Sequence, residues 1–384
     1  MPAAGQHGRM KTRRTGALAA SLAVLFVLAG CAARPAEPSA GPDDWEHAAQ
    51  SALEETLRTT GIPGGAITVT HDDVTWTGVA GLADVATGRK VAADDRFAFR
   101  SITKSFTVTA VLQLVDEGKV SLDDPISDYV DGVPEGDRIT LRDLARMRSG
   151  LPNYSATPAF QDALRIDLTR DWTDAELLQA AYSEPNDFAP GARYEYSNTN
   201  TVLLGEVLQK VTGEPWYDVV QRAILTPRGL STTTYPDSDP IPSPLAEPYQ
   251  GGGEGQEPEA LPAIPANSLS AAGGFAGTIR DLGRWARILG TGELLDESTA
   301  AQRTSEASLS PTSDDPNSPF YDAYGMGMGE IDGWIGHTGN GLGYQALAMY
   351  DPATGDSVAI VINGTGDDRD APAHLFQKLI PALG

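Results

Sequence analysis

The chain has 384 residues, with 28 lysine and arginine residues against 52 aspartate and glutamate residues, and its formal net charge is −24. Hydrophobic residues make up 41% and charged residues 21%, which excludes a disordered or fibrous protein, and a chain of this size commonly folds into two lobes with a cleft between them. Such an acidic surface repels phosphates, so we expect no nucleic-acid partner.

The first thirty residues have the order found in a secretory signal. A basic stretch ends at Arg13-Arg14, and the apolar run 17–29 that follows is too short to span a membrane. It ends in Leu-Ala-Gly-Cys31, which resembles the lipobox of bacterial lipoproteins, whose cysteine becomes a lipid-carrying N-terminus. We therefore expect residues 1–30 to be a lipoprotein signal peptide and Cys31 to anchor the exported protein to the outer face of the cell membrane. Export by the general or the twin-arginine route stays open.

The elements at the start of the folded part follow from apolar periodicity and glycine stops. Residues 31–44 are rich in alanine, proline and acids, which predicts a flexible tether before a domain that spans 45–384. The pattern then predicts a helix that ends at Gly61, a buried strand Gly65–Thr70, a second strand Val74–Gly81, and a long helix Ile102–Gly118 with Ser101 at its start.

The middle and the end of the chain differ in pattern. Residues 121–264 have short helical runs punctuated by proline and glycine, at Leu141–Met147, Glu176–Ala181 and Thr201–Val211. Next come a helix Ile279–Leu289, strands Tyr324–Met328, Trp334–Thr338, Gln345–Tyr350 and Ser357–Asn363, and a closing helix Ala373–Ile380. These patterns predict an α+β fold, in which an antiparallel β-sheet flanked by helices (residues 45–120 and 265–384) carries an inserted all-helical lobe (residues 121–264).

Ser101 and Lys104 form the first chemical constellation. On a helix, positions three apart lie on one face, so the lysine amine is within hydrogen-bond reach of the serine hydroxyl. A lysine acts as the base for a serine nucleophile where burial disfavours its charged form. By itself the S-x-x-K pattern is common, and a helix-capping serine with a surface lysine explains it better.

Two further constellations follow. Tyr196 and Asn198, in Tyr-Glu-Tyr196-Ser-Asn198, point the same way if their loop is extended, and a phenol and an amide there can move a proton and hold a substrate. The alternative is an ordinary turn with an asparagine cap. His337-Thr338-Gly339 runs along a strand candidate, and glycine lets a substrate backbone approach closely. The alternative there is a plain strand end before a glycine-rich turn.

Together, in this order and spacing, the three constellations resemble the penicillin-recognising serine hydrolases, which comprise penicillin-binding proteins, serine β-lactamases and related esterases. Further landmarks are the segments Ile139–Leu144, Ser149–Pro152, Pro190-Gly191, Ala272–Gly274 and Tyr324-Gly325. The resemblance implies a β-lactamase/transpeptidase-like fold and the following roles: Ser101 is the acylated nucleophile, Lys104 and Tyr196 share acid and base work, Asn198, His337, Thr338 and Gly339 bind substrate, and the backbone N–H groups of Ser101 and Asn340 form the oxyanion hole. No metal or other cofactor is implied.

The branch of the family depends on the third constellation. His337-Thr-Gly with Tyr-Ser-Asn198 resembles exported D-alanyl-D-alanine carboxypeptidases, whereas class C β-lactamases usually have lysine at position 337. Gly329-Glu330 stands where some carboxypeptidases carry a carboxylate-binding arginine, and a histidine is largely neutral above a pKa of about 6.5. We therefore expect weak carboxylate binding at neutral pH, improving as His337 becomes charged.

The substrates implied are small peptides, β-lactams or esters. Carboxypeptidase-like hydrolysis is the leading hypothesis, with an esterase or a β-lactamase as alternatives. A non-catalytic penicillin-binding or cell-wall-binding module is the alternative of another class, and the complete proton-transfer set argues against it. The sequence indicates no carboxylate partner for His47, His71 or His374, which we expect at the surface.

Overall fold

The computed structural model describes residues 44–384 except 252, 254, 314, 316 and 317, and these residues belong to one compact unit. The predicted signal peptide, the lipid anchor at Cys31 and all but the last residue of the predicted tether lie outside the described residues.

A sheet of nine strands forms the centre of the sheet lobe, in the order β3-β2-β1-β13-β12-β11-β10-β9-β8. All its strand pairs are antiparallel, and the register Gly65↔Ile362 joins the beginning of the domain to its end. The strands are β1 Gly64–His71, β2 Val74–Asp84, β3 Arg89–Lys90, β8 Ser310–Pro311, β9 Ala323–Tyr324, β10 Gly329–Ile331, β11 Trp334–Gly341, β12 Tyr344–Tyr350 and β13 Ser357–Ile362.

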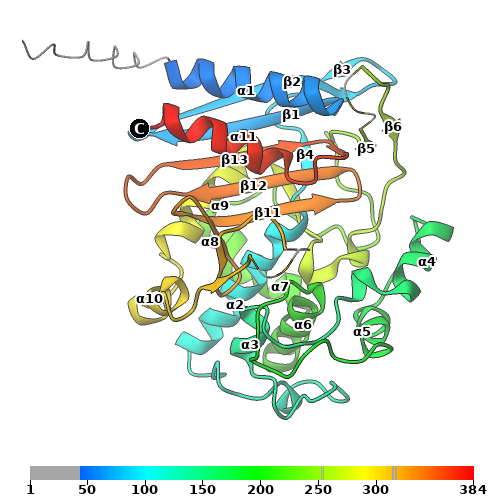
Figure 1. Cartoon of the computed structure of the whole chain (residues 1–384), viewed down its shortest axis with the longest axis vertical. Coiled ribbons are helices and arrows are strands. Elements are labelled where there is room, and N and C mark those ends of the chain that lie inside the picture. Colours follow the sequence, from blue (N-terminus) through cyan, green and yellow to red (C-terminus); the bar gives the residue numbers. More distant parts are fainter. Residues whose placement is uncertain (1–43, 252, 254, 314, 316–317) are drawn as a thin grey trace, which may run out of the picture. The chain divides into compact units, whose positions relative to one another are not determined.

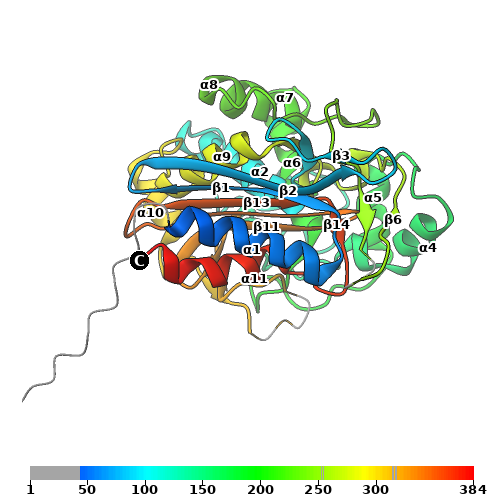
Figure 2. The same cartoon turned by 90° about the horizontal axis from the view of Figure 1, so that it is seen from above.

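Helices cover both faces of this sheet. Helices α1 (Asp44–Thr60) and α11 (Ala371–Leu379) lie side by side on one face, while α9 (Ile279–Thr291) lies on the other (Figures 1 and 2). Because both faces are covered, β13 is buried along its whole length, and after Ser357 it is continuously apolar rather than alternating. Helix α10 (Glu297–Thr304) follows α9.

The second lobe consists mainly of short helices. Three of them begin at a threonine whose hydroxyl accepts a hydrogen bond from the first helical turn, which satisfies a backbone N–H that the helix itself leaves unpaired. The helices of the lobe are α3 Leu141–Ala145, α4 Pro158–Ile166, α5 Asp174–Tyr182, α6 Asn198–Thr212, α7 Trp216–Val220 and α8 Thr226–Arg228.

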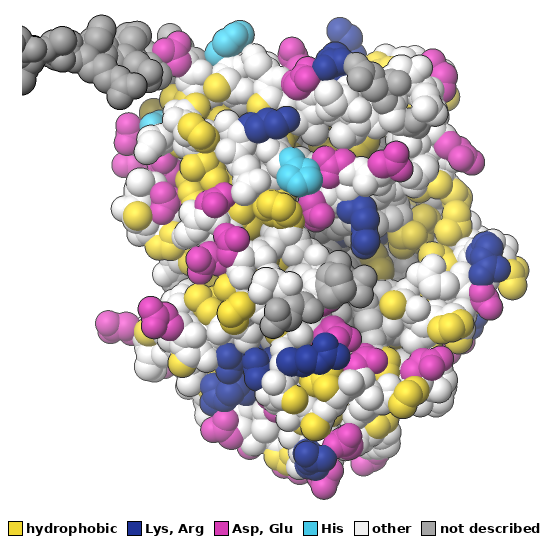
Figure 3. Space-filling model, in the orientation of Figure 1, with side chains coloured by type: hydrophobic (Ala, Val, Ile, Leu, Met, Phe, Trp, Pro, Cys, Tyr) yellow, Lys and Arg dark blue, Asp and Glu magenta, His cyan; other side chains and the backbone are white. Residues whose placement is uncertain are grey.

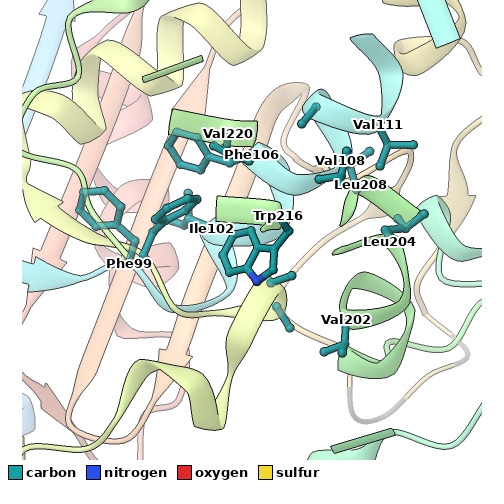
Figure 4. Close-up of a cluster of buried hydrophobic side chains, with 14 of the residues drawn as sticks. Phe99, Ile102, Phe106, Val108, Val111, Val202, Leu204, Leu208, Trp216 and Val220 are labelled. Atoms are coloured by element: carbon teal, nitrogen blue, oxygen red, sulfur yellow. The ribbon is translucent and has the colours of Figure 1, made fainter. Parts of the chain in front are cut away.

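Helix α2 (Thr103–Asp116) packs against both parts of the molecule and is buried almost throughout. Figure 4 shows its Phe106 and Val108 beside residues of α6 and α7. The Phe106 ring stacks on Trp285 of α9 with 3.7 Å between ring centroids, and the Trp285 indole donates to Ser105 Oγ at 2.8 Å. Truncating a buried phenylalanine of this kind costs about 3–5 kcal/mol, so this packing fixes the start of α2 firmly.

The structure departs from the sequence prediction in several stretches. The predicted strand Tyr324–Met328 ends at Tyr324, because Gly327 takes a φ of +68° and its N–H donates to the Ala145 carbonyl at 3.0 Å. The predicted all-helical lobe also contains two short strands, β5 (Tyr249–Gln250) and β6 (Glu259–Ala260), which form a small sheet with β14 (Gly364–Thr365). A further ribbon pairs β4 (Arg96–Ala98) with β7 (Ala276–Thr278).

Candidate active site

Ser101 lies in a single 3₁₀ turn, Arg100–Ile102, between β4 and α2. The preceding Arg100 has a φ of +52°, a conformation that costs energy for a residue with a side chain. Burial of Arg100 and a 2.6 Å hydrogen bond from its Nη2 to the Leu342 carbonyl hold the turn in place. Ser101 does not cap α2, so the helix-capping alternative does not apply.

Lys104 is fully buried in the first turn of α2. Its Nζ donates to Ser101 Oγ at 3.0 Å and to the Ala272 carbonyl at 2.7 Å. Among the described residues no carboxylate forms an ion pair with it, and burial away from water lowers the pKa of Lys104 well below its usual value. The surface-lysine alternative is therefore wrong, and the amine beside Ser101 can exist in the neutral form that accepts a proton.

Tyr196 lies next to this pair, with its ring centroid 5.0 Å from Lys104 Nζ. Its hydroxyl is buried and makes no hydrogen bond of standard geometry with the described residues. The nearby Ser101 side chain lowers the pKa of Tyr196 slightly. Burial outweighs that effect and raises the pKa of Tyr196 well above its usual value. The phenol is therefore neutral at neutral pH and can donate a proton.

Asn198 is the first residue of α6, so the segment is extended only as far as Ser197. Its backbone N–H donates to Asn153 Oδ1 at 3.1 Å, and its side-chain amide donates to Ser155 Oγ at 2.8 Å. Among the described residues, the Ala272 carbonyl rather than the Asn198 amide bonds the Lys104 amine.

The edge of β11 forms one wall beside Ser101. Strand β10 pairs with β11 only as far as Gly336, so from there the strand has no β10 partner. A side chain at Gly339 would bring Cβ within 2.3 Å of the Phe99 carbonyl and 3.1 Å of the Ser101 nitrogen. Glycine is required here because the backbones of β11 and the Ser101 turn are nearly in contact.

His337 was predicted to line the cleft, and the structure corrects this. Its side chain is fully buried behind the strand, where Nδ1 bonds the Thr338 carbonyl at 2.6 Å and Nε2 bonds the Tyr324 hydroxyl at 3.0 Å. Because a carbonyl can only accept, Nδ1 carries the proton of a neutral ring. Burial lowers the pKa of His337 to about 3, with a smaller contribution from the Lys104 charge, so the ring does not become charged near neutral pH.

Two adjoining hollows, of about 280 and 780 Å³, meet at Ser101. Both are lined by Ser101, Asn153, Ser155, Tyr196, Asn198, Asn340 and Arg369, and Thr338, Gly339 and Asp370 line the smaller one. The structure thus brings together every predicted site residue within the described part of the chain except the side chain of His337. Sequence reasoning missed Asn153, Ser155, Arg369 and Asp370, none of which stands in a recognisable motif.

The remaining titratable candidates are peripheral to this site. His47 is exposed as predicted, but His71 and His374 have carboxylate partners, with Nδ1 of each 2.7 Å from Asp356 and 3.0 Å from Asp368. Within the described residues there is no cluster of histidine, cysteine, aspartate and glutamate that could hold a metal ion. In that same part of the chain, no helix has the length and apolarity needed to cross a membrane.

Comparison with known proteins agrees with this geometry. Residues 49–380 match the sequence profile of the Beta-lactamase family. The chain is 26% identical over 353 residues to Penicillin-binding protein 4 of Amycolatopsis lactamdurans, a match that covers 88% of this chain and 91% of that protein. It is 29% identical over 212 residues to Esterase EstB of Burkholderia gladioli, which covers 52% of this chain and 53% of the esterase. The chain spans about half the length or less of several curated relatives.

A solved structure shows the same fold over almost the whole domain. The D-stereospecific amidohydrolase from Streptomyces sp. is 32% identical, with a TM-score of 0.75, and the match covers 88% of this chain and 97% of that one. The antiparallel sheet with its flanking helices therefore has the β-lactamase/transpeptidase-like architecture that the sequence predicts.

Proposed function

The chain belongs to the Beta-lactamase family, and from that membership and the geometry at Ser101 we propose that it is a serine acyl-hydrolase that cleaves amide or peptide bonds through an acyl-enzyme. The observation that carries the proposal is the 3.0 Å hydrogen bond between a fully buried Lys104 amine and Ser101 Oγ. Burying a charged amine without a carboxylate partner costs several kcal/mol, and packing alone offers no compensation.

The proposed reaction uses the groups at hand in sequence. Neutral Lys104 Nζ accepts the Ser101 proton as Oγ bonds to the substrate carbonyl carbon. The carbonyl oxygen becomes an oxyanion, and we assign its stabilisation to the backbone N–H groups of Ser101 and Asn340. Tyr196 donates a proton to the leaving amine and recovers one from Lys104, so that the C–N bond breaks and the acyl-enzyme remains. Water then attacks the ester by the same route and releases the acid and Ser101.

For the substrate, carboxypeptidase-like hydrolysis of peptides with D-configured residues remains our leading proposal. Its main difficulty was the missing carboxylate anchor, and Arg369 supplies a candidate. Arg369 lines both hollows at Ser101, is exposed, and forms no hydrogen bond or ion pair with the described residues. A planar guanidinium in that position is suited to hold the terminal carboxylate of a peptide.

A second candidate is hydrolysis of D-amino acid amides that carry a free amino group. Asp370 lines the smaller hollow, and burial raises its pKa. The positive charge of a bound ammonium group would lower that pKa again and pair with the carboxylate. The similarity to a D-stereospecific amidohydrolase supports this candidate as well.

Matched substrates separate the candidates. A D-Ala-D-Ala peptide is compared with its C-terminal amide, and D-alanine amide is compared with its N-acetyl derivative. A short p-nitrophenyl ester tests the esterase alternative, and a cephalosporin tests the β-lactamase alternative.

If Arg369 anchors a carboxylate, Arg369→Gln raises KM for the free-acid peptide and leaves the kinetics of the ester unchanged. If Asp370 anchors an ammonium, Asp370→Asn impairs only the free-amine amide. Absence of turnover on every substrate would leave the non-catalytic binding module.

We also propose that the protein is exported and held at the outer face of the cell membrane through lipid on Cys31. The order of the basic stretch, the apolar run and the Leu-Ala-Gly-Cys31 segment supports this. Membrane fractionation of a Cys31→Ser variant tests it. The variant should be released or remain unprocessed, and a processed variant that still sediments with membranes would contradict the proposal.

A further inference from the structure

We propose that a groove between α9 and the β1–β2 hairpin binds a phosphate-bearing anion. The groove has a volume of about 540 Å³, and Arg280, Arg284 and Arg287 line it from α9. It shares no lining residue with the two hollows at Ser101, so this binding site is separate from the proposed catalytic function.

The three arginines occupy one face of α9. Their spacing of four and then three residues makes them neighbours along the helix surface, where like charges repel each other. Arg280 and Arg284 are exposed and Arg287 is half-buried. Arg284 and Arg287 each donate to a backbone carbonyl, of Gly229 at 3.0 Å and of Gly355 at 2.8 Å, and Arg280 makes no hydrogen bond with the described residues.

None of the three forms an ion pair within the described part of the chain, where half of the arginines do. Other arginines there commonly pair with carboxylates, as Arg138 does with Glu135, Arg165 with Asp162 and Arg222 with Glu214. With 52 acidic residues against 28 basic ones, partners are abundant. A row of adjacent cations without acidic partners weakens the helix, and an anionic ligand would remove that repulsion.

The opposite wall of the groove carries hydroxyl groups. Thr68 and Thr70 of β1 bond to Thr77 and Thr75 of β2 at 3.1 and 2.9 Å, and all four residues line the groove. Thr68 donates its proton to the Trp76 carbonyl at 2.9 Å, so the Thr68–Thr77 pair has no proton left for a ligand, whereas the Thr70–Thr75 pair keeps one that can rotate toward a ligand oxygen. Guanidinium groups therefore stand on one wall of the groove and threonine side chains on the other.

Two carboxylates also line the groove. Asp281 already accepts from the backbone N–H groups of Thr232 and Thr233, at 2.7 and 3.1 Å, which leaves it little capacity to attract a cation. Asp94 is exposed at the rim. Three guanidinium groups therefore outweigh them, and the pairing geometry of arginine with phosphate oxygens favours phosphate among anions.

The net charge of −24 limits the strength of binding without preventing it. At physiological ionic strength the Debye length is about 8 Å, so distant acidic residues are largely screened while contacts inside the groove are not. We expect modest affinity that falls as salt rises. The phosphate can come from a soluble phosphoester or from the headgroup of an anionic lipid, and both present the same oxygens.

The test uses the full chain with Cys31→Ser, which carries no lipid, and compares Arg280→Gln/Arg284→Gln with the charge-matched control Arg138→Gln/Arg165→Gln. Titration calorimetry with glycerol phosphate and pyrophosphate measures soluble ligands. Sedimentation with phosphatidylglycerol vesicles, against phosphatidylcholine vesicles, measures lipid binding. Ester turnover and the unfolding midpoint show whether each variant is intact.

We expect the groove variant to lose at least tenfold in affinity for one or both kinds of phosphate while the control variant keeps its affinity and both keep ester turnover. Binding of the soluble esters alone identifies a soluble ligand, and binding of anionic vesicles alone identifies a headgroup. The proposal is overturned if the unsubstituted chain binds neither probe at low salt, or if the control variant loses as much affinity as the groove variant.

Discussion

At the scale of single residues, the proposed chemistry depends on Lys104, which is buried without a carboxylate partner and lies next to Ser101. Burial destabilises the ammonium form, and the carbonyl of Ala272 orients the amine without supplying a charge. Tyr196 is kept neutral by the same lack of water. The two groups therefore differ in role, since the amine is the proton acceptor and the phenol is the proton donor.

Removing either group should slow acylation without unfolding the protein. We predict that Lys104→Ala and Tyr196→Phe each lower the acylation rate on the order of 10²–10⁴-fold. The losses should not multiply, because both groups serve one proton path. Stopped-flow acylation by a penicillin measures this, with Lys119→Ala at an exposed site as control. A double variant whose loss equals the product of the single losses would contradict the shared path.

The pH dependence should come from Lys104 and not from His337. As pH falls, Lys104 binds a proton and can no longer act as the base, so the acylation rate decreases at acidic pH. The pKa of His337 is about 3, so its ring stays neutral from pH 5 to 8 and adds no second inflection. NMR of labelled histidine rings measures this directly. A His337 signal that titrates near pH 6.5 would contradict the buried placement and restore the charged histidine that the sequence led us to expect.

A site residue could be predicted from the sequence when it contacts a partner close to it along the chain. Ser101 and Lys104 are three residues apart on one turn, so spacing alone predicts their contact. Thr338 and His337 are adjacent, yet Thr338 lines the hollow at Ser101 while the His337 side chain is buried behind the strand. The sequence pattern did not indicate which of the two would face the substrate. Arg369 comes to line the hollow at Ser101 only through the path of the loop before α11, which leaves no signature in the sequence.

At the scale of elements, the site is made by a close approach of β11 to the Ser101 turn. We predict that Gly339→Ala lowers kcat/KM by about 10²-fold, because an added methyl group displaces the turn and a shift of about 1 Å in the reacting groups has that effect. Steady-state ester kinetics measure it.

Gly366→Ala is the matched control for that substitution, since its added Cβ would meet only carbonyl oxygens at 3.9 and 4.0 Å. Unchanged kinetics in Gly339→Ala, with a folded protein by circular dichroism, would show that the approach of the two backbones does not position Ser101.

Long periodic elements were predictable and short irregular ones were not. Helix α2 and strands β12 and β13 follow their apolar patterns closely. The predicted strand Tyr324–Met328 failed because the buried side chains there serve a turn at Gly327 that contacts α2 and α3, and a contact between distant segments has no periodicity. Strands β5 and β6 have two residues each, too few for any pattern.

At the scale of the whole molecule, the fold forces Lys104 into the interior at a cost in stability. The unfolded chain binds a proton at Lys104 below its ordinary pKa of about 10.5, whereas the folded protein releases it at a much lower pH. Between the pKa of Lys104 in the folded protein and its ordinary pKa, the unfolded state binds more protons than the folded state. The contribution of Lys104 to the free energy of unfolding therefore rises with pH in this range.

We therefore predict that Lys104→Met is more stable relative to the unsubstituted protein at pH 7 than at pH 9. Urea unfolding at the two pH values measures the difference, and Lys119→Met, which changes an exposed lysine paired with Glu117, should show none. Equal differences at both pH values would mean that Lys104 stays protonated in the folded protein and is no base.

If Ser101 forms an acyl-enzyme, incubation with a penicillin should add the mass of one ring-opened penicillin to the intact protein. We expect one adduct per chain by intact-mass analysis, located by peptide mapping on Ser101, absent from Ser101→Ala and formed slowly in Lys104→Ala. An adduct that persists in Ser101→Ala, or none on a protein that turns over esters, would contradict an acyl-enzyme on Ser101.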